Sequence, residues 1–239
     1  MNFPLIRGII FDKDGTLFDF ATTWEAWAAA LLNNLFDGDR TRATAAGAAI
    51  GFDLSTRRFR RDSVAIAGTV EDIVDALAPT CPDLGRDALT DRLNAEAETA
   101  PQSETVDLVP FLSGLRARGL ALGVATNDAE APARAHLDSA GVTALFDFVA
   151  GFDSGHGGKP APGQLLAFCA QVGLDPDEVV MVGDSLQDLR AGRAAGMRTL
   201  GVLTGMAQAR ELAPLSDQVL PDIGHIPAWL DQQSGSVTP

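Results

Sequence analysis

Residues 9–19 have the sequence IIFDKDGTLFD, and this stretch decides how the rest of the chain folds. Its apolar beginning is typical of the end of a buried strand, and the Asp-Lys-Asp-Gly that follows turns the backbone. Side chains two residues apart on an extended segment point to the same side, so Asp12 and Asp14 are expected to lie close together. Neighbouring carboxylates repel each other unless a cation, a proton or a positive side chain lies between them. The acid pair therefore calls for a partner elsewhere in the chain.

The acid pair has two simpler interpretations. One is a solvent-facing Asp-Gly turn between two strands, which this stretch alone leaves open. The other is a Ca²⁺-binding loop, but a loop of the EF-hand type needs further ligands at fixed steps and a closing Glu at its twelfth position. The residues after Asp19 are mainly apolar instead, which disfavours calcium.

The composition is that of a globular protein. Hydrophobic residues make up 46% of the 239, enough for one large or two modest cores. No apolar run approaches the length of a membrane span and no signal-peptide pattern opens the chain, so we expect a cytoplasmic protein. The two cysteines, Cys81 and Cys169, indicate neither a disulfide framework nor a cysteine-based metal site.

The formal net charge of −14 argues against two classes of partner. It would repel the phosphates of nucleic acid and the surface of an anionic membrane. An anionic substrate would need a site made locally positive by a metal ion and a few basic side chains. The one dense basic cluster is interpreted as a solvated helix face, with an anion-binding patch as the alternative; it consists of Arg57, Arg58, Arg60 and Arg61.

The residues after the acid pair predict an inserted set of helices. Helical patterns with no strand pattern between them occur at residues 21–36, 40–50, 69–77 and 87–97. Trp24 and Trp27 belong to a buried stripe of the first helix, and Thr69 is a suitable cap for the third. We therefore predict a helical cap domain at residues 20–103 and a core domain at residues 1–19 and 104–239.

From residue 106 onward, strand and helix patterns alternate. Strands are predicted at residues 120–125, 148–151, 179–182 and 199–203, with helices at 109–118, 131–140, 162–172 and 185–195. Such alternation predicts the α/β class, with a doubly wound, Rossmann-like parallel sheet covered on both faces. The last residues, 232–239, are expected to form a frayed tail.

Ligands of a parallel sheet bind outside the carboxyl ends of its strands. Polar residues from four loops are predicted at this edge, namely Asp12 with Asp14, Thr126 with Asn127, Lys159, and Asp184 with Asp188. Taken singly, Thr126 and Asn127 are ordinary turn residues, Lys159 a surface lysine and Asp184 a helix cap. The three histidines do not cluster near these motifs in the sequence, so no zinc site is predicted.

Four motifs resemble, in order, those of the haloacid dehalogenase superfamily: DKDGTL at 12–17, Thr126-Asn127, Lys159-Pro160, and Gly183-Asp184-Ser185 with Asp188. The helical insert resembles the cap of the branch that includes phosphoglycolate phosphatases and β-phosphoglucomutases. The resemblance implies a dehalogenase-like α/β core with an inserted all-helical cap.

The resemblance also implies a Mg²⁺-dependent phosphatase that acts on a small phosphorylated metabolite. Asp12 would attack phosphorus and form an aspartyl-phosphate, while Asp14 would serve as acid and base. Asp12, the backbone carbonyl of Asp14, and Asp184 would hold Mg²⁺. Because a dehalogenase of this superfamily needs no second acid at position 14, Asp14 favours phosphoryl transfer over carbon–halogen cleavage.

The remaining motif residues receive supporting roles from the resemblance. Thr126, Asn127 and Lys159 would bind phosphoryl oxygens, and Asp188 would orient water or Lys159. Lys13 replaces the apolar residue usual between the two acids, and it either covers the site or faces away. A phosphomutase of the β-phosphoglucomutase type and a non-catalytic phosphate-binding protein are the alternatives. We expect a monomer or homodimer.

Overall fold

A computed structural model describes residues 5–235. It contains a six-stranded sheet in the order β5-β4-β1-β6-β7-β8, and all of its strand pairs are parallel. The strands are β1 (Gly8–Phe11), β4 (Ala121–Ala125), β5 (Phe148–Ala150), β6 (Val179–Gly183), β7 (Arg198–Val202) and β8 (Gln218–Leu220). The predicted α/β class is confirmed, and β8 is an additional edge strand.

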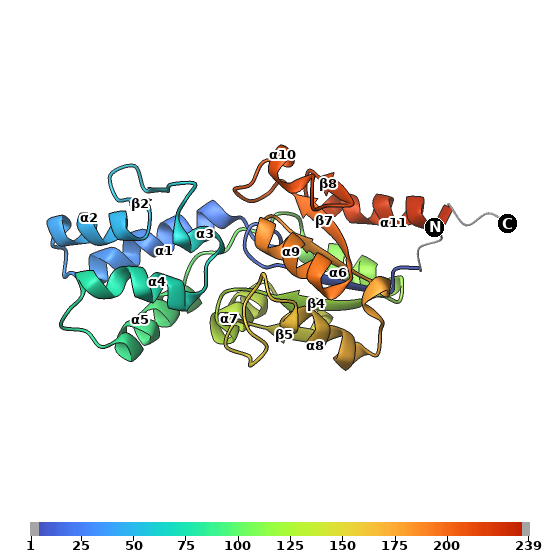
Figure 1. Cartoon of the computed structure of the whole chain (residues 1–239), viewed down its shortest axis with the longest axis horizontal. Helices are drawn as coiled ribbons and strands as arrows, with labels where there is room; N and C mark the ends of the chain where they lie inside the picture. The colour runs from blue at the N-terminus through green and yellow to red at the C-terminus, as the bar shows by residue number, and fades with distance from the viewer. Residues whose placement is uncertain (1–4, 236–239) are drawn as a thin grey trace.

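Helices cover both faces of this sheet (Figure 1). One face packs against α6 (Leu108–Ala117), α7 (Glu130–Ser139) and α11 (Ile226–Gly235). The other packs against α8 (Gly163–Val172) and α9 (Leu186–Ala195), and the short α10 (Ala209–Leu212) follows β7. In β1 the side chain of Phe11 belongs to one face and that of Ile10 to the other, which explains why the central strands are apolar without alternation.

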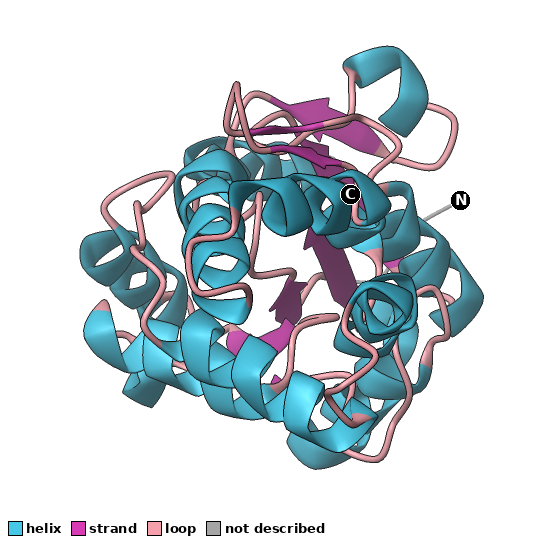
Figure 2. Cartoon of the chain, turned by 90° about the vertical axis from the view of Figure 1, so that its left-hand side faces the viewer, coloured by secondary structure: helices cyan, strands magenta, loops and turns pink. Residues whose placement is uncertain are grey.

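The segment between β1 and α6 lies to one side of the sheet. It consists of α1 (Phe20–Leu35), α2 (Arg40–Ala49), α3 (Val64–Ala67), α4 (Val70–Leu77) and α5 (Arg86–Glu98), with a small hairpin of β2 (Phe52–Asp53) and β3 (Arg58–Phe59). Figure 2, viewed from this side, shows the strands of the sheet behind its helices. The insert has its own hydrophobic cluster, and the domain boundaries at residues 20–103 stay a prediction.

The prediction that the arginine cluster at residues 57–61 lies on a helix is wrong. Arg57 lies in the turn of the β2–β3 hairpin, in which Phe52 pairs with Phe59, and Arg58 belongs to its second strand. Arg60 and Arg61 follow that strand. The carboxylate of Asp53 accepts hydrogen bonds from the backbone of Ser55 and Thr56 and so fixes the turn. All four arginines are exposed, as a solvated surface requires.

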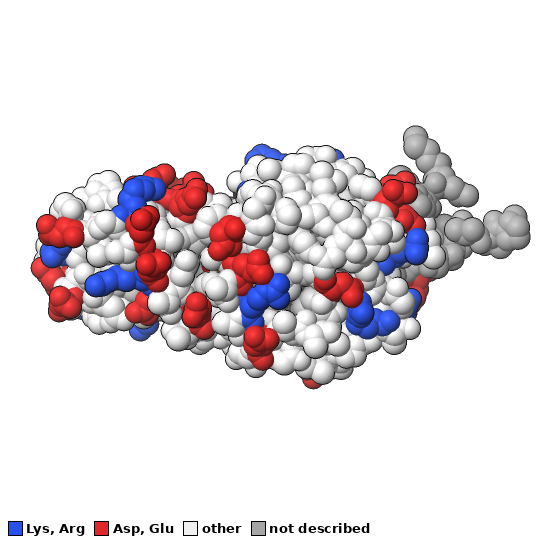
Figure 3. Space-filling view, turned by 90° about the horizontal axis from the view of Figure 1, so that it is seen from below, with Lys and Arg blue, Asp and Glu red and all other residues white. Residues whose placement is uncertain are grey.

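The prediction that a frayed tail begins at residue 232 is also wrong. Residues 232–235 belong to α11, which the buried Trp229 anchors to the sheet. Residues 236–239 lie outside the described part of the chain. No helix within residues 5–235 is both long and apolar enough to cross a membrane. On the face shown in Figure 3, basic side chains are interspersed with acidic ones and form no continuous basic surface.

Candidate active site

The carboxyl edge of the sheet gathers the predicted residues. Asp12 follows β1, Thr126 follows β4 and Asp184 follows β6, so the three residues end neighbouring parallel strands. The backbone N–H of Asp12 donates to the carbonyl of Val182 at 2.8 Å, which continues the ladder beyond the last residue of β1. All seven predicted site residues line one cavity of about 60 Å³.

Lys159 connects two of the acids. Its Nζ lies 2.7 Å from Oδ1 of Asp12 and 2.6 Å from Oδ1 of Asp188, and it donates to the carbonyl of Ala125 at 2.7 Å. Burial alone would lower the pKa of Lys159, but the two carboxylates outweigh burial and raise it. Lys159 therefore keeps its positive charge inside the cavity.

Asn127 holds the main chain of Lys159 in place. Its Nδ2 donates to the carbonyl of Lys159 at 2.9 Å, and its Oδ1 accepts from the backbone N–H of Lys159 at 2.7 Å. The hydroxyl oxygen of Thr126 accepts from the backbone N–H of Asp128 at 3.0 Å. The predicted phosphoryl contacts of Thr126 and Asn127 stay predictions, while Asn127 has a clear role in placing the lysine.

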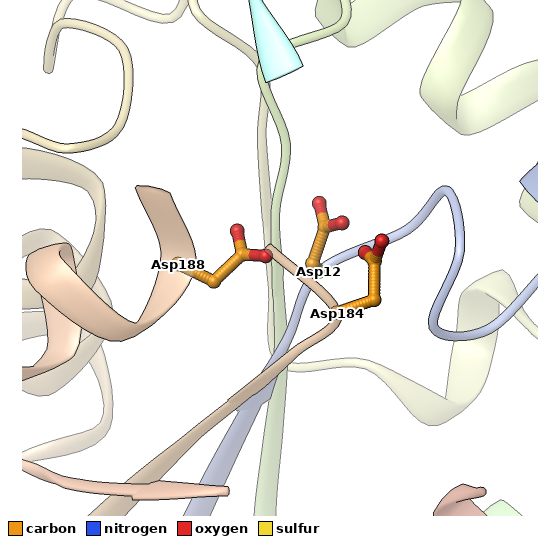
Figure 4. Close-up of side chains that lie close together, drawn as sticks. All are labelled: Asp12, Asp184 and Asp188. Carbon is orange, nitrogen blue, oxygen red and sulfur yellow. The ribbon is translucent and has the colours of Figure 1, made fainter. Parts of the chain in front are cut away.

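Three buried carboxylates form an acidic cluster (Figure 4). One oxygen each of Asp12, Asp184 and Asp188 lies within 4.8 Å of the others. Burial, and after it the charge of Asp188, raises the pKa of Asp12 to about 7. Burial and the charge of Asp12 likewise raise the pKa of Asp184. Because a divalent cation would relieve this repulsion and hard cations prefer carboxylate oxygens, the residues fit such an ion.

Two glycines keep space for the carboxylate of Asp184. Gly15 has a φ of 81°, and a Cβ at this position would lie 2.5 Å from Cγ of Asp184. A Cβ at Gly205 would overlap the same carboxylate. Sequence reasoning missed Gly205 because it lies in a loop after β7 that carries none of the four motifs.

Lys13 faces inward and is fully buried. Its Nζ lies 2.8 Å from Oδ2 of Asp14 and 3.2 Å from Oδ2 of Asp128, and it is 5.4 Å from the ring centre of Trp24. Burial would lower the pKa of Lys13, but Asp14 and Asp128 raise it. The carboxylate of Asp14 is thus paired with Lys13 and lies outside the acidic cluster. The predicted metal contact through its backbone carbonyl stays a prediction.

His136 links Lys13 to the insert. Its Nε2 lies 2.7 Å from the carbonyl of Ala97 in α5, and its Nδ1 lies 2.8 Å from Nζ of Lys13. A carbonyl only accepts, so Nε2 carries the proton and Nδ1 accepts from the ammonium. Burial, and after it the positive charge of Lys13, lowers the pKa of His136 to about 4.

Sequence reasoning missed both Asp128 and His136. Asp128 directly follows the Thr126-Asn127 motif, and that proximity was a usable signal. His136 is 123 residues from Lys13 and sits on the buried face of α7, so nothing in its local pattern points to the site.

Comparisons with known proteins show which family the chain belongs to. A sequence model of the family "Hydrolase: haloacid dehalogenase-like hydrolase" matches residues 6–196. A phosphoglycolate phosphatase of Nitrosospira multiformis is 30% identical over 228 residues, which cover 93% of this chain and 95% of the relative. An N-acetylmuramic acid 6-phosphate phosphatase of Pseudomonas aeruginosa is 27% identical over 205 residues, covering 84% of this chain and 83% of the relative.

Solved structures show the same fold. A predicted phosphoglycolate phosphatase from Haemophilus somnus superposes with a TM-score of 0.70 at 21% identity and covers 94% of this chain and 97% of its own. A β-phosphoglucomutase from Clostridium difficile superposes with a TM-score of 0.68 at 14% identity, covering 97% and 98%. At these identities the likeness concerns the fold alone.

Proposed function

The chain belongs to the haloacid dehalogenase-like hydrolases and is a phosphatase; from this premise we propose that it hydrolyses the monoester of a small metabolite through a phosphoryl group carried on Asp12. The observation that carries the proposal is the convergence of Asp12, Lys159 and Asp184 in one cavity. Residues from three separate loops supply a nucleophile, a cation and a further carboxylate there.

The reaction takes two steps. In the first, a carboxylate oxygen of Asp12 bonds to phosphorus as the ester P–O bond breaks, and Asp14 gives a proton to the leaving alkoxide. In the second, Asp14 takes a proton from water as the water oxygen bonds to phosphorus and the bond to Asp12 breaks. Inorganic phosphate leaves, and both carboxyl groups return to their starting states.

Asp12 and Asp184, with the backbone carbonyl of Asp14, would hold Mg²⁺. The bound ion would offset the negative charge of the phosphoryl oxygens. Asp188 has a different role, since its Oδ1 pairs with Lys159 and its Oδ2 accepts from the backbone N–H and hydroxyl of Ser185. These contacts support Asp188 as the residue that orients Lys159.

Lys159 would contact the phosphoryl group directly, and Thr126 and Asn127 would complete its binding site. Helices of the insert form the opposite wall of the cavity. We therefore assign residues 20–103 the role of a cap that excludes water during transfer.

Replacing Asp12 with Asn tests the proposal. Phosphate release from a panel of phosphorylated metabolites with Mg²⁺ should fall by several orders of magnitude while the circular dichroism spectrum stays unchanged. The matched control is Asp83→Asn at an exposed position, which should keep full activity. Chelation of Mg²⁺ should abolish activity and its return should restore it. Retained activity in Asp12→Asn contradicts the nucleophilic role, and an absolute requirement for a bisphosphate would indicate a phosphomutase instead.

A further inference from the structure

The wall of the cavity that the insert supplies is uncharged. Its side chains are aromatic or aliphatic apart from one amide, that of Asn94, and include Phe20, Trp24, Ile66, Val70 and Ile73. Among the described residues that line the cavity, Lys159 is the one cation. Its ammonium already contacts two carboxylates and a carbonyl beside the phosphoryl position. The leaving group of a substrate would therefore meet an apolar surface.

The charge balance of the site disfavours a second anion on the substrate. Five carboxylates line the cavity, those of Asp12, Asp14, Asp128, Asp184 and Asp188. Lys13 and Lys159 are the ammonium groups that pair with them. With Asp14 protonated, as its transfer of a proton to the leaving alkoxide requires, the two ammonium groups and a divalent cation only balance the other four carboxylates. A carboxylate on the leaving group would find no positive charge in excess, and leaving it unpaired is costly in an apolar setting.

Besides Oδ2 of Asp128, which faces the ammonium of Lys13, two buried acceptors on the cavity wall lack a hydrogen-bond partner within the described chain. They are Oδ1 of Asn94 on α5 and Oε1 of Gln187 on α9. Buried polar atoms are almost always satisfied in folded proteins, and an unsatisfied one costs free energy. A ligand with an N–H or O–H donor would satisfy them, whereas a carboxylate offers acceptors only.

The cavity limits the size of the leaving group. Its volume is about 60 Å³, on a measure in which one water needs roughly 10–15 Å³. This space holds a phosphoryl group and a leaving group of only a few non-hydrogen atoms.

We propose that the substrate is the phosphate monoester of a small, uncharged alcohol that carries a hydrogen-bond donor, and that an anionic leaving group such as that of phosphoglycolate is disfavoured. This inference rests on the proposed phosphatase function and narrows its substrate class. It separates the chain from the activity named for its phosphoglycolate phosphatase relatives.

The test compares three esters with the Mg²⁺-loaded protein. Phosphoglycolate and its primary amide, phosphoglycolamide, have nearly the same size and differ in charge and in hydrogen-bond donors. Propyl phosphate lacks both the carboxylate and the amide. We expect kcat/KM for the amide to exceed that for phosphoglycolate at least tenfold, with propyl phosphate also hydrolysed better than phosphoglycolate.

Two variants locate the preference in the cavity wall. Ile66→Arg adds a cation opposite the phosphoryl position and should lower the ratio of amide to phosphoglycolate at least tenfold. Asn94→Leu removes the unsatisfied acceptor and should lower the preference for the amide over propyl phosphate. Asn33→Leu, on the exposed face of α1, is the matched control and should leave both ratios unchanged.

The outcomes distinguish the proposed substrate class from the proposed phosphatase function. A ratio of amide to phosphoglycolate below ten in the unmodified protein overturns the substrate class and leaves the phosphatase mechanism standing. If no ester in the panel releases phosphate with Mg²⁺, both proposals fail. Variants that change neither ratio contradict the assignment of selectivity to Ile66 and Asn94.

Discussion

Lys13 compensates the charge of two buried carboxylates beside the reaction site. It pairs with Asp14 and Asp128, and each of these carboxylates is itself mostly or fully shielded from water. A buried ion pair contributes little net stability, but removing one partner leaves the other as an uncompensated buried charge. The residue that separates the two acids of the motif is thus part of the site's charge balance.

Replacing Lys13 with Met should destabilise the fold by about 3–5 kcal/mol, because two carboxylates would lose their buried counter-charge. Urea denaturation at neutral pH measures the change in the free energy of unfolding. Arg58→Met is the control, since it breaks an exposed pair with Glu25 and should cost less than about 0.5 kcal/mol. Equal, small effects in both variants would show that Lys13 does not compensate the two acids.

His136 gives stability a specific dependence on pH. It is buried, faces Lys13 and Asp14, and has its pKa lowered from 6.5 to about 4. Between these values the unfolded chain binds a proton that the folded chain does not, so stability falls as the pH drops from about 6.5 to 4. The loss should approach about 3 kcal/mol.

Comparison with His136→Gln isolates this effect. Asp12 and Asp128, with pKa values raised to about 7 and about 6, act in the opposite sense but are present in both proteins. The difference in unfolding free energy between the two proteins should therefore change by about 3 kcal/mol from pH 7 to pH 4. A difference that is constant with pH would mean that His136 titrates normally in the folded state.

At the scale of elements, α4 shows how local sequence sets the cavity wall. Thr69 caps the helix in a capping box with Asp72, and Val70 and Ile73 then line the cavity. Thr69→Ala should cost about 1 kcal/mol of stability in thermal or urea unfolding. The control is Thr90→Ala at a partly buried position within α5, where the hydroxyl donates to the carbonyl of Arg86 and no cap is lost. A cost no greater than that of the control would argue against the cap.

The sequence predicted the elements that have long and regular patterns. The strands β1, β4 and β6 are continuous apolar runs that end at polar or glycine residues, so the edge that carries Asp12, Thr126 and Asp184 could be foreseen. The β2–β3 hairpin was not predicted, because strands of two residues are too short to show an alternation of apolar and polar residues. The three-residue strand β8, of which only Leu220 is buried, was not predicted for the same reason.

The site residues that belong to the four motifs could be predicted from the sequence. Lys159, far from Asp12 in the chain, was placed beside it by the rule that ligands bind at the carboxyl ends of parallel strands. The bridge from Lys13 through His136 to Ala97 depends on how α7 packs against α5, and packing between distant helices leaves no local pattern.

At the scale of the whole molecule, the sheet and the insert have separate hydrophobic clusters and meet around the cavity. We expect the insert to move relative to the sheet when the site is filled, because substrate must enter and water must then be excluded. Small-angle scattering should therefore give different profiles with and without Mg²⁺ and beryllium fluoride. Identical profiles would count against closure.

The central claim is that distant residues assemble around one phosphoryl group on Asp12. A crystal structure with Mg²⁺ and beryllium fluoride, which mimics that group, tests it most directly. We predict beryllium fluoride bonded to a carboxylate oxygen of Asp12, with Nζ of Lys159 in contact with its fluorines and Mg²⁺ bound by Asp12 and Asp184. Beryllium fluoride bound at another residue, or Lys159 turned away from it, would contradict the account.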